Sequence, residues 1–248
     1  MGYTTEFTGK VVFDKEVPKT LVEYLNRLSG TRRMKRDPEK IKVLFKNWKD
    51  MCYKGNLGKQ GEYFAVKEDD PDYVNYKNSR DSFFSYCAGQ ARDGSIVDYN
   101  EPPVTQPGLW CQWVISPVNP KDMEDETKDT VRAYLEWDGG EKFYCYTEWL
   151  KYIIKNFLEL EGITACGAFL AVGEEYGDAT YIIVDNNNVS TVDAFNEGAS
   201  EELCNKLSGD LLKFFLEEVS SAPSQIASEY WDDWYDDDED DEEDEEED

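Results

Sequence analysis

The chain has 248 residues, of which 40% are hydrophobic and 14% aromatic, so it can bury a sizeable core. Its formal net charge is −28, and it contains no histidine. The absence of histidine excludes Ser-His-Asp and Cys-His catalysis, histidine-ligated metals and histidine proton shuttles. No run of about 18 apolar residues occurs, so we expect no membrane span. The first residues lack the basic and apolar regions of a secretory signal.

Cysteine usage indicates a reducing compartment. The chain has six cysteines and no C-x-x-C pair, so the close thiolate pairs of a structural zinc site are missing. We therefore expect reduced, mostly buried thiols and a cytoplasmic location. The sequence predicts neither a metal nor a cofactor. The six residues are Cys52, Cys87, Cys111, Cys145, Cys166 and Cys204.

The first third of the chain predicts a strand and two helices. Residues 5–13 alternate between apolar and polar, as in a half-exposed strand. A helix follows from Pro18 and stops at Gly30. Asp37 is placed to cap a second helix with Pro38 at its first position. That helix is predicted to carry one apolar stripe, formed by Ile41, Leu44, Phe45, Trp48 and Cys52.

The middle of the chain begins with a loop-rich segment at 54–108, which is rich in Gly, Asp, Asn, Tyr and Pro and shows little periodicity. Strands are then predicted at 109–115 and 131–137, paired as a hairpin around a charged loop. Thr147 is the expected N-cap of a helix that Gly162 ends.

The last third predicts strands at 163–172, 180–184 and 189–192, with a tight turn of three asparagines before the last of them. Ser200 is expected to cap a final amphipathic helix that runs to Val219. Strands and helices do not alternate strictly, which favours an α+β fold with a mostly antiparallel sheet and helices on one face. We therefore predict one domain at 1–219, with residues 220–248 as a linker and tail.

Four segments together resemble a family of uncharacterised proteins of bacteria and bacteriophages. They are GYTTEFTG (2–9), TRRMKRD (31–37), the stretch from VDYN (97–100) through QPGLWCQW (106–113), and EWDGGEKFY (136–144). The resemblance spans roughly residues 2–185 and implies a common fold. It transfers no catalytic residue, since no function is attached to the family. The loops at 46–92 and 117–130, the last helix and the tail depart from it.

The polyacidic end is the clearest feature of the sequence. Fifteen of the 17 residues at 232–248 are Asp or Glu, and no Lys or Arg follows Lys213. Such a segment buries little apolar area, so we expect it to be disordered and extended. Dense carboxylates imitate a phosphate array and suit a basic partner, while aromatic side chains beside them supply anchors. The predicted partner-binding residues are Tyr230, Trp231, Trp234 and Tyr235. Solubilisation and intramolecular screening of a basic patch are the alternatives.

A basic run precedes the second helix. Arg32, Arg33, Lys35 and Arg36 are candidates for holding a phosphate or another anion. The alternative is a solvated turn with internal salt bridges. The negative charge of the rest of the chain argues against direct, broad nucleic-acid binding and allows one local anion site.

Three carboxylates gather around the Asp-Gly-Gly turn. Glu136, Asp138 and Glu141 are candidates for acid-base work or for a hard cation, because paired carboxylates can serve both. Carboxylates near such turns are more often turn formers and caps. Five aromatic residues suit base or sugar stacking but are more often core: Trp110, Trp113, Trp137, Phe143 and Trp149.

The leading hypothesis is a non-enzymatic interaction protein. Its tail would engage a basic partner, such as a nucleic-acid-binding protein, as a nucleic-acid mimic or in a chaperone-like role, and the phage resemblance allows a viral setting. The alternative is an enzyme or binding domain for a phosphorylated small molecule or nucleotide, using the run at 32–36 and the carboxylates at 136–141. The sequence does not define the oligomeric state.

Overall fold

The computed structural model describes residues 2–67, 90 and 92–195. The described residues form a six-stranded, wholly antiparallel sheet in the order β10-β9-β8-β1-β7-β5. The predicted α+β class with a mainly antiparallel sheet is therefore confirmed. The strands are β1 (Thr5–Phe13), β5 (Trp113–Pro117), β7 (Ala133–Trp137), β8 (Ala165–Gly173), β9 (Ala179–Asp185) and β10 (Asn188–Asp193).

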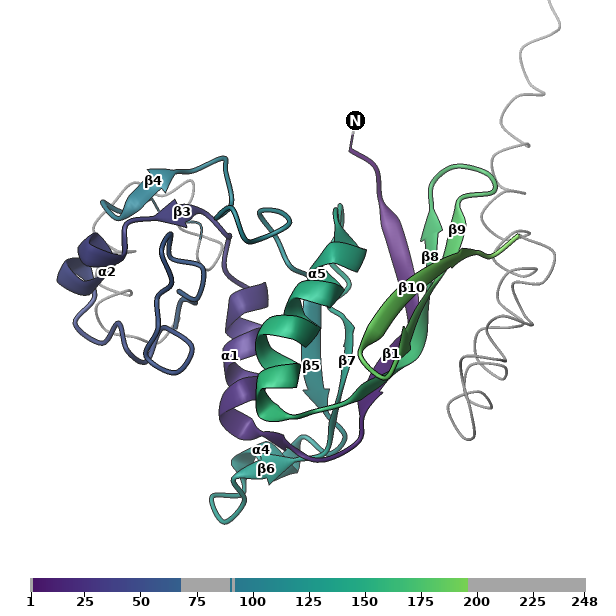
Figure 1. Ribbon diagram of the computed structural model, residues 1–248, viewed down its shortest axis with the longest axis horizontal. Coiled ribbons are helices and arrows are strands. Elements are labelled where there is room, and N and C mark those ends of the chain that lie inside the picture. The colour runs from purple at the N-terminus through teal and green to yellow at the C-terminus, as the bar shows by residue number, and fades with distance from the viewer. Residues whose placement is uncertain (1, 68–89, 91, 196–248) are drawn as a thin grey trace, which may run out of the picture.

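Two helices lie on one face of this sheet, in front of β5 and β7 in Figure 1. Helix α1 (Lys19–Ser29) buries Leu21, Leu25 and Leu28, and Gly30 follows it, as expected. Helix α5 (Tyr146–Ile153) continues through a π-helical turn, η1 (Ile154–Leu158), and a 3-10 turn, η2 (Glu159–Glu161). No helix in the described part of the chain is both long and apolar enough to cross a bilayer.

The N-terminus of α5 differs from the prediction. The helix begins at Tyr146, so Thr147 lies inside it and Cys145 takes the cap position. Cys145 has the left-handed backbone angle φ 55° and gives no side-chain cap hydrogen bond. The chain must turn sharply there after the buried Phe143, and this tertiary demand outweighs the capping preference of threonine.

Strands β1 and β8 meet over nine residue pairs, and two glycines allow the approach. Gly9 has φ +122°, and a Cβ there would lie 2.4 Å from the Ala168 carbonyl oxygen. Gly167 has φ +153°, and a Cβ there would lie 2.4 Å from the Lys10 carbonyl oxygen. Neither position tolerates a side chain without moving backbone, so these glycines fix how closely the two central strands pack.

Both faces of the sheet are apolar at its β8–β9 side. Phe169, Ile182 and Val184 belong to the main core beneath the helices. The alternate residues Leu170 and Ile183, each 0% exposed, belong to a second cluster with Ala168, Ala179, Tyr181 and Val192. The predicted last helix, at 200–219, and the tail lie outside the described residues.

A smaller lobe stands beside the sheet, at the left of Figure 1. We call residues 31–67 the basic lobe. It holds β3 (Lys35–Arg36) and α2 (Pro38–Leu44), and β3 pairs with β4 (Ile96–Asp98). The lobe has its own apolar cluster, made of Ile41, Phe45, Met51, Cys52, Leu57, Phe64 and Val66. A short extension elsewhere contains α4 (Lys121–Glu124) and the pair β2 (Val17–Pro18) and β6 (Thr130–Val131).

Helix α2 is shorter than its apolar stripe predicts. Asp37 caps it as expected, with Oδ1 accepting from the Glu39 and Lys40 amides at 2.9 and 3.4 Å. The helix nevertheless ends at Leu44, because Phe45 takes an extended conformation and packs on Phe64 at 5.3 Å between ring centroids. The stripe therefore continues through turns rather than along one helix face.

Candidate functional site

The basic run enters the lobe as a strand, and two of its four cations are buried. Arg33 is 2% exposed. Its Nη1 donates to the Phe64 carbonyl and its Nη2 to the Glu62 carbonyl, each at 2.7 Å, and its Nε donates to Gln106 Oε1 at 3.3 Å. Burial lowers the pKa of Arg33. Two branches of this guanidinium thus hold the lobe together, and the third connects it to Gln106 in the 103–107 loop.

Arg36 is also buried, at 3% exposure. Its Nη1 forms an ion pair with Asp93 and donates to Ser95 Oγ at 2.8 Å, and its guanidinium lies 4.8 Å from the Phe64 ring centroid. Asp93 Oδ1 in turn accepts from the Ser95 amide at 2.8 Å. This network ties β3 to the segment before β4, and a buried pair of this kind is costly to break.

The other two cations of the run lie nearer the surface. Lys35 pairs with Glu101 at 2.5 Å. The Arg32 guanidinium lies 4.5 Å from the Tyr99 ring centroid and 6.0 Å from that of Trp110, and its Nε donates to the Tyr99 carbonyl at 3.3 Å. Arg92 also stacks on Tyr99, at 4.8 Å. Of the predicted anion-binding residues, Arg32 and Lys35 are therefore the two placed to meet a ligand.

The carboxylate trio lies elsewhere, at the end of β7. Glu136 accepts from Ser116 Oγ across the β5–β7 pair. Asp138 Oδ1 accepts from the Gly140 amide at 2.8 Å, as a turn-forming aspartate does. Desolvation by neighbouring protein atoms raises the pKa of Asp138, although the residue reaches the surface. Glu141 is held by its backbone, whose carbonyl accepts from Gln112 Nε2 at 2.8 Å.

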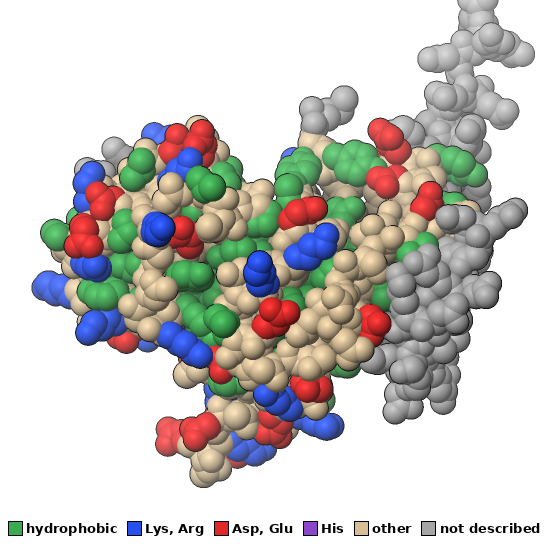
Figure 2. Space-filling model, in the orientation of Figure 1, with side chains coloured by type: hydrophobic (Ala, Val, Ile, Leu, Met, Phe, Trp, Pro, Cys, Tyr) green, Lys and Arg blue, Asp and Glu red, His purple; other side chains and the backbone are tan. Residues whose placement is uncertain are grey.

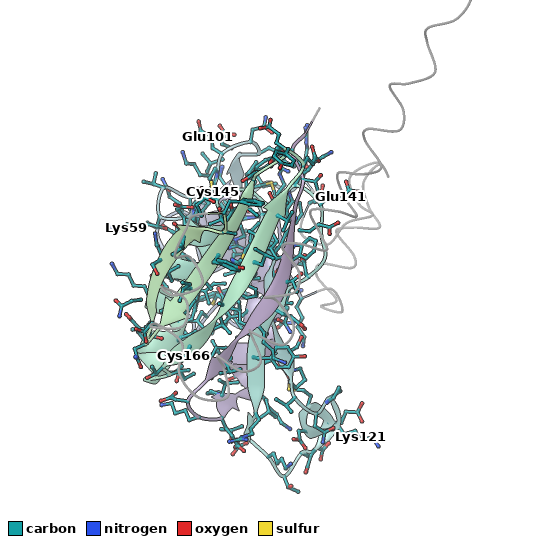
Figure 3. All side chains as sticks on the ribbon, turned by 90° about the vertical axis from the view of Figure 1, so that its right-hand side faces the viewer. Lys59, Glu101, Lys121, Glu141, Cys145 and Cys166 are labelled. Atoms are coloured by element: carbon teal, nitrogen blue, oxygen red, sulfur yellow. The ribbon has the colours of Figure 1, made fainter. Side chains whose placement is uncertain are left out.

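The two candidate sets belong to different parts of the molecule. The basic run lies in and before β3, whereas the carboxylates lie in the last residues of β7 and just after it, in the main sheet (Figure 1). Figure 3 likewise shows Glu101, the partner of Lys35, apart from Glu141. Within residues 2–67 and 92–195, no group of three or more Cys, Asp or Glu side chains is arranged to hold a metal ion. The basic run at 32–36 and the carboxylates at 136–141 therefore do not form one joint site for a phosphate and a metal ion within these described residues.

Four of the six cysteines are described, and their environments differ. Cys52 and Cys111 are buried, and desolvation raises their pKa values to about 11 and about 12. Cys166 is half-buried and Cys145 is exposed. Figure 3 shows these two at opposite ends of the sheet. The expected burial thus holds for Cys52 and Cys111 but is wrong for Cys145, while Cys87 and Cys204 lie outside the described residues.

Most of the candidate stacking aromatics are core. Trp113, Phe143 and Trp149 are at most 2% exposed, and Trp137 is half-buried. Phe7 is central to this group, with edge-on contacts of 5.2 Å to Trp113 and 5.7 Å to Phe143. Trp110 differs, since it is half-buried beside Arg32. The partner-binding residues predicted in the tail, Tyr230, Trp231, Trp234 and Tyr235, lie outside the described residues.

Sequence reasoning missed two contributors to the Arg32 site. Tyr99 and Arg92 come from the segment read as a featureless loop, and only the fold brings them to Arg32. It also missed Gln106, which accepts from Arg33 and donates to Tyr152 Oη at 3.1 Å. The presence of Tyr99 and Gln106 within the resemblance motifs was the available signal.

Comparison with protein-family models, with curated proteins and with solved structures gives no match.

Proposed function

We propose that this protein is a non-enzymatic interaction protein whose acidic tail engages a basic partner, such as a nucleic-acid-binding protein. The observation that carries the proposal is the concentration of 15 carboxylates in the 17 residues at 232–248, preceded and interrupted by aromatic residues. Carboxylates at this density attract a basic surface and steer it, and the aromatic side chains then supply short-range anchoring. In this proposal the folded body is the scaffold that carries the tail.

The roles of the described site residues support a scaffold role for the body. Arg33 and Arg36 are used to hold the lobe together, and Asp138 forms its turn. The lack of histidine removes the commonest general base. The resemblance of four motifs to bacterial and bacteriophage proteins is part of the same proposal and is compatible with a viral setting for such an interaction protein.

The test is an affinity pull-down from a host lysate with two full-length forms. One is the native chain, and the other carries Asn and Gln in place of the 15 tail carboxylates, which keeps the tail length and its aromatic residues. The proposal expects basic proteins to bind the native form, to be lost from the amide form, and to dissociate as salt is raised. Identical partner sets for both forms would contradict it.

A second candidate function rests on the Arg32 site. Arg32 lies over the Tyr99 ring with Trp110 6.0 Å away, and Lys35 follows three residues later. This combination of a guanidinium, an ammonium and aromatic faces suits a phosphorylated ligand with a ring. A thermal-shift series with nucleotides and sugar phosphates tests it, since binding to the native state raises the melting temperature. The Arg32→Gln variant should lose that rise, and no rise with any ligand would count against this candidate.

A further inference from the structure

Charge is segregated along the chain beyond the tail itself. The basic lobe contains eleven Lys or Arg and four Asp or Glu, a net charge of +7 in a protein of net charge −28. The tail at 232–248 carries −15. Figure 2 shows Lys and Arg side chains spread over the lobe at the left of the molecule. The chain therefore joins one strongly basic region and one strongly acidic region.

The positive charge of the lobe is presented at its surface. Of the four acids, Asp37 is used to cap α2, Glu62 is buried with its carboxylate accepting from the Gln60 amide at 2.6 Å, and Asp50 is exposed. Glu39 pairs with Lys42 at 2.7 Å. Seven lysines of the lobe are exposed: Lys40, Lys42, Lys46, Lys49, Lys54, Lys59 and Lys67.

Four of these lysines fall within residues 40–49, which we call the lysine segment. The segment also presents apolar surface: Val43 is 81% exposed and Leu44 39%. The half-buried Trp48 has Lys42 Nζ at 5.6 Å and Lys49 Nζ at 5.8 Å from its ring centroid. Ammonium groups thus alternate with apolar and aromatic surface, which is the complement of a segment that alternates carboxylates with aromatic rings.

We propose that the lysine segment is a docking surface for the acidic tail of the same chain. The tail offers both matching components, because Trp231, Trp234 and Tyr235 lie among its first carboxylates. The tether gives the tail an effective concentration of order mM at this surface, which a free polyanion must exceed. A nucleic acid that approached the lysine segment would be repelled by the net charge of −20 on the residues outside the lobe and the tail, which makes it a poorer occupant.

The chain is long enough for this contact. Residues 220–248 can span up to about 95 Å at about 3.3 Å per residue. A folded body of this size has a radius of gyration of roughly 16 Å. The later carboxylates of the tail can therefore reach across a body of this size to the lobe. The inference concerns an internal contact and does not rest on the external partner proposed above.

The contact has a functional consequence. A tail held by the lysine segment is withheld from other basic surfaces, so an external partner must compete with the lobe. Loss of the lysines should then strengthen binding of the tail to a basic probe, because the apparent affinity rises with the fraction of molecules whose tail is free.

Carbodiimide crosslinking of the full chain tests the contact directly, since it joins a carboxylate to a lysine amine that touches it. No Lys or Arg follows Lys213, so any lysine joined to residues 214–248 reports a carboxylate of that end of the chain. We expect these crosslinks to concentrate on Lys40, Lys42, Lys46 and Lys49 near 0.15 M salt and to disappear near 1 M, where the Debye length falls from about 8 to about 3 Å. An equal mixture of unlabelled and ¹⁵N-labelled protein separates contacts within a chain from those between chains.

Two matched variants complete the experiment. One changes Lys40, Lys42, Lys46 and Lys49 to Gln, and the other changes the exposed Lys121, Lys128, Lys151 and Lys155 to Gln. Only the first should free the tail, seen as tighter binding of the full chain to a lysine decamer. Tail crosslinks spread evenly over both lysine groups, crosslinks only between chains, or equal decamer binding by both variants would overturn the inference. A tail that fails to bind any external partner yet crosslinks to the lysine segment would contradict only the proposed function.

Discussion

The main sheet and the basic lobe are held together by different interactions. The sheet is stabilised by apolar burial: Phe169, Ile182 and Leu135 are each 0% exposed, and nine residue pairs join its central strands. The lobe has a smaller apolar cluster, and two buried arginines connect it to Asp93 and Gln106, on either side of β4. The stability of the lobe therefore depends on buried charged side chains that must keep their partners. The stability of the sheet depends mainly on the packing of apolar side chains.

This difference suggests different roles for the two regions, with the sheet as the scaffold and the lobe as a binding surface. Around the sheet, apolar side chains form the main core, which includes most of the candidate stacking aromatics. In the lobe, the buried arginines build the structure, and the lysines lie exposed at the surface. Binding chemistry is thus expected on the lobe and on the tail, with the sheet as support.

The largest effect is expected in the sheet. Phe7→Ala removes a ring that contacts Trp113, Trp137, Phe143 and Tyr146. We expect the free energy of unfolding to fall by about 3–5 kcal/mol, the usual cost of emptying an aromatic core site. Urea denaturation measures it, with Val104→Ala, at a residue 79% exposed, as a control expected to change little. Similar values for both variants would contradict the assigned core.

A slightly smaller loss is expected from the buried pair in the lobe. Arg36→Met leaves Asp93 buried and without its ion-pair partner, which should cost about 3 kcal/mol. The double variant Arg36→Met, Asp93→Asn should recover part of this loss, because no buried charge then remains. A double variant as unstable as the sum of the two single variants would show that the pair does not act as a unit.

Alkaline pH should destabilise the fold. Burial raises the pKa of Tyr152 from 10.0 to about 12 and that of Cys111 from 9.0 to about 12. The folded state favours the neutral, protonated forms, so their stabilisation is complete below the ordinary pKa values and is lost as pH rises towards 12. We expect the unfolding free energy to fall by about 2 kcal/mol or more between pH 8 and 11.

The Tyr152→Phe variant sharpens this prediction. It removes one of the two titrating groups, so its loss between the same two pH values should be smaller by about 1 kcal/mol. Urea denaturation at each pH gives both numbers. An unfolding free energy of the native chain that stays constant over this range would contradict the assigned burial of Tyr152 and Cys111.

The smallest effect is expected at the N-cap of α2. Asp37→Ala removes the carboxylate that accepts from the Glu39 and Lys40 amides and should cost about 1 kcal/mol. Asp37→Asn should cost less, because its side-chain oxygen still accepts. Hydrogen exchange should rise in the lobe and not in the main sheet, and a uniform rise would argue against a separate lobe unit.

Sequence reasoning predicted the sheet better than the lobe, for a physical reason. Strand β1 shows a clear alternation of apolar and polar residues. The β9–β10 hairpin is marked by its asparagine turn, in which Asn186 and Asn187 have φ angles of 46° and 69°. Strand β4 has only three residues, too few to show a period, and it forms because β3 needs a partner. Helix α2 was predicted too long, because an apolar stripe does not reveal where Phe45 must turn to reach Phe64.

The candidate site was predicted in residue type but not in role. The basic run was correctly singled out, yet no local pattern distinguishes the buried Arg33 and Arg36 from Arg32 and Lys35. The partners that decide their roles, Asp93 and Tyr99, lie about 60 residues away in the chain. Long-range contacts of this kind arise from the fold and leave no periodic trace in the sequence.

The most direct test of the central claim is the salt dependence with which the full chain binds a defined basic probe, the lysine decamer. Titrations at several salt concentrations give the slope of log Kd against log salt. We predict tight binding at low salt with a steep slope for the native chain, and loss of both when the 15 tail carboxylates are replaced by amides. Equal affinity and equal slope for the two forms would show that the tail does not engage basic partners and would contradict the account.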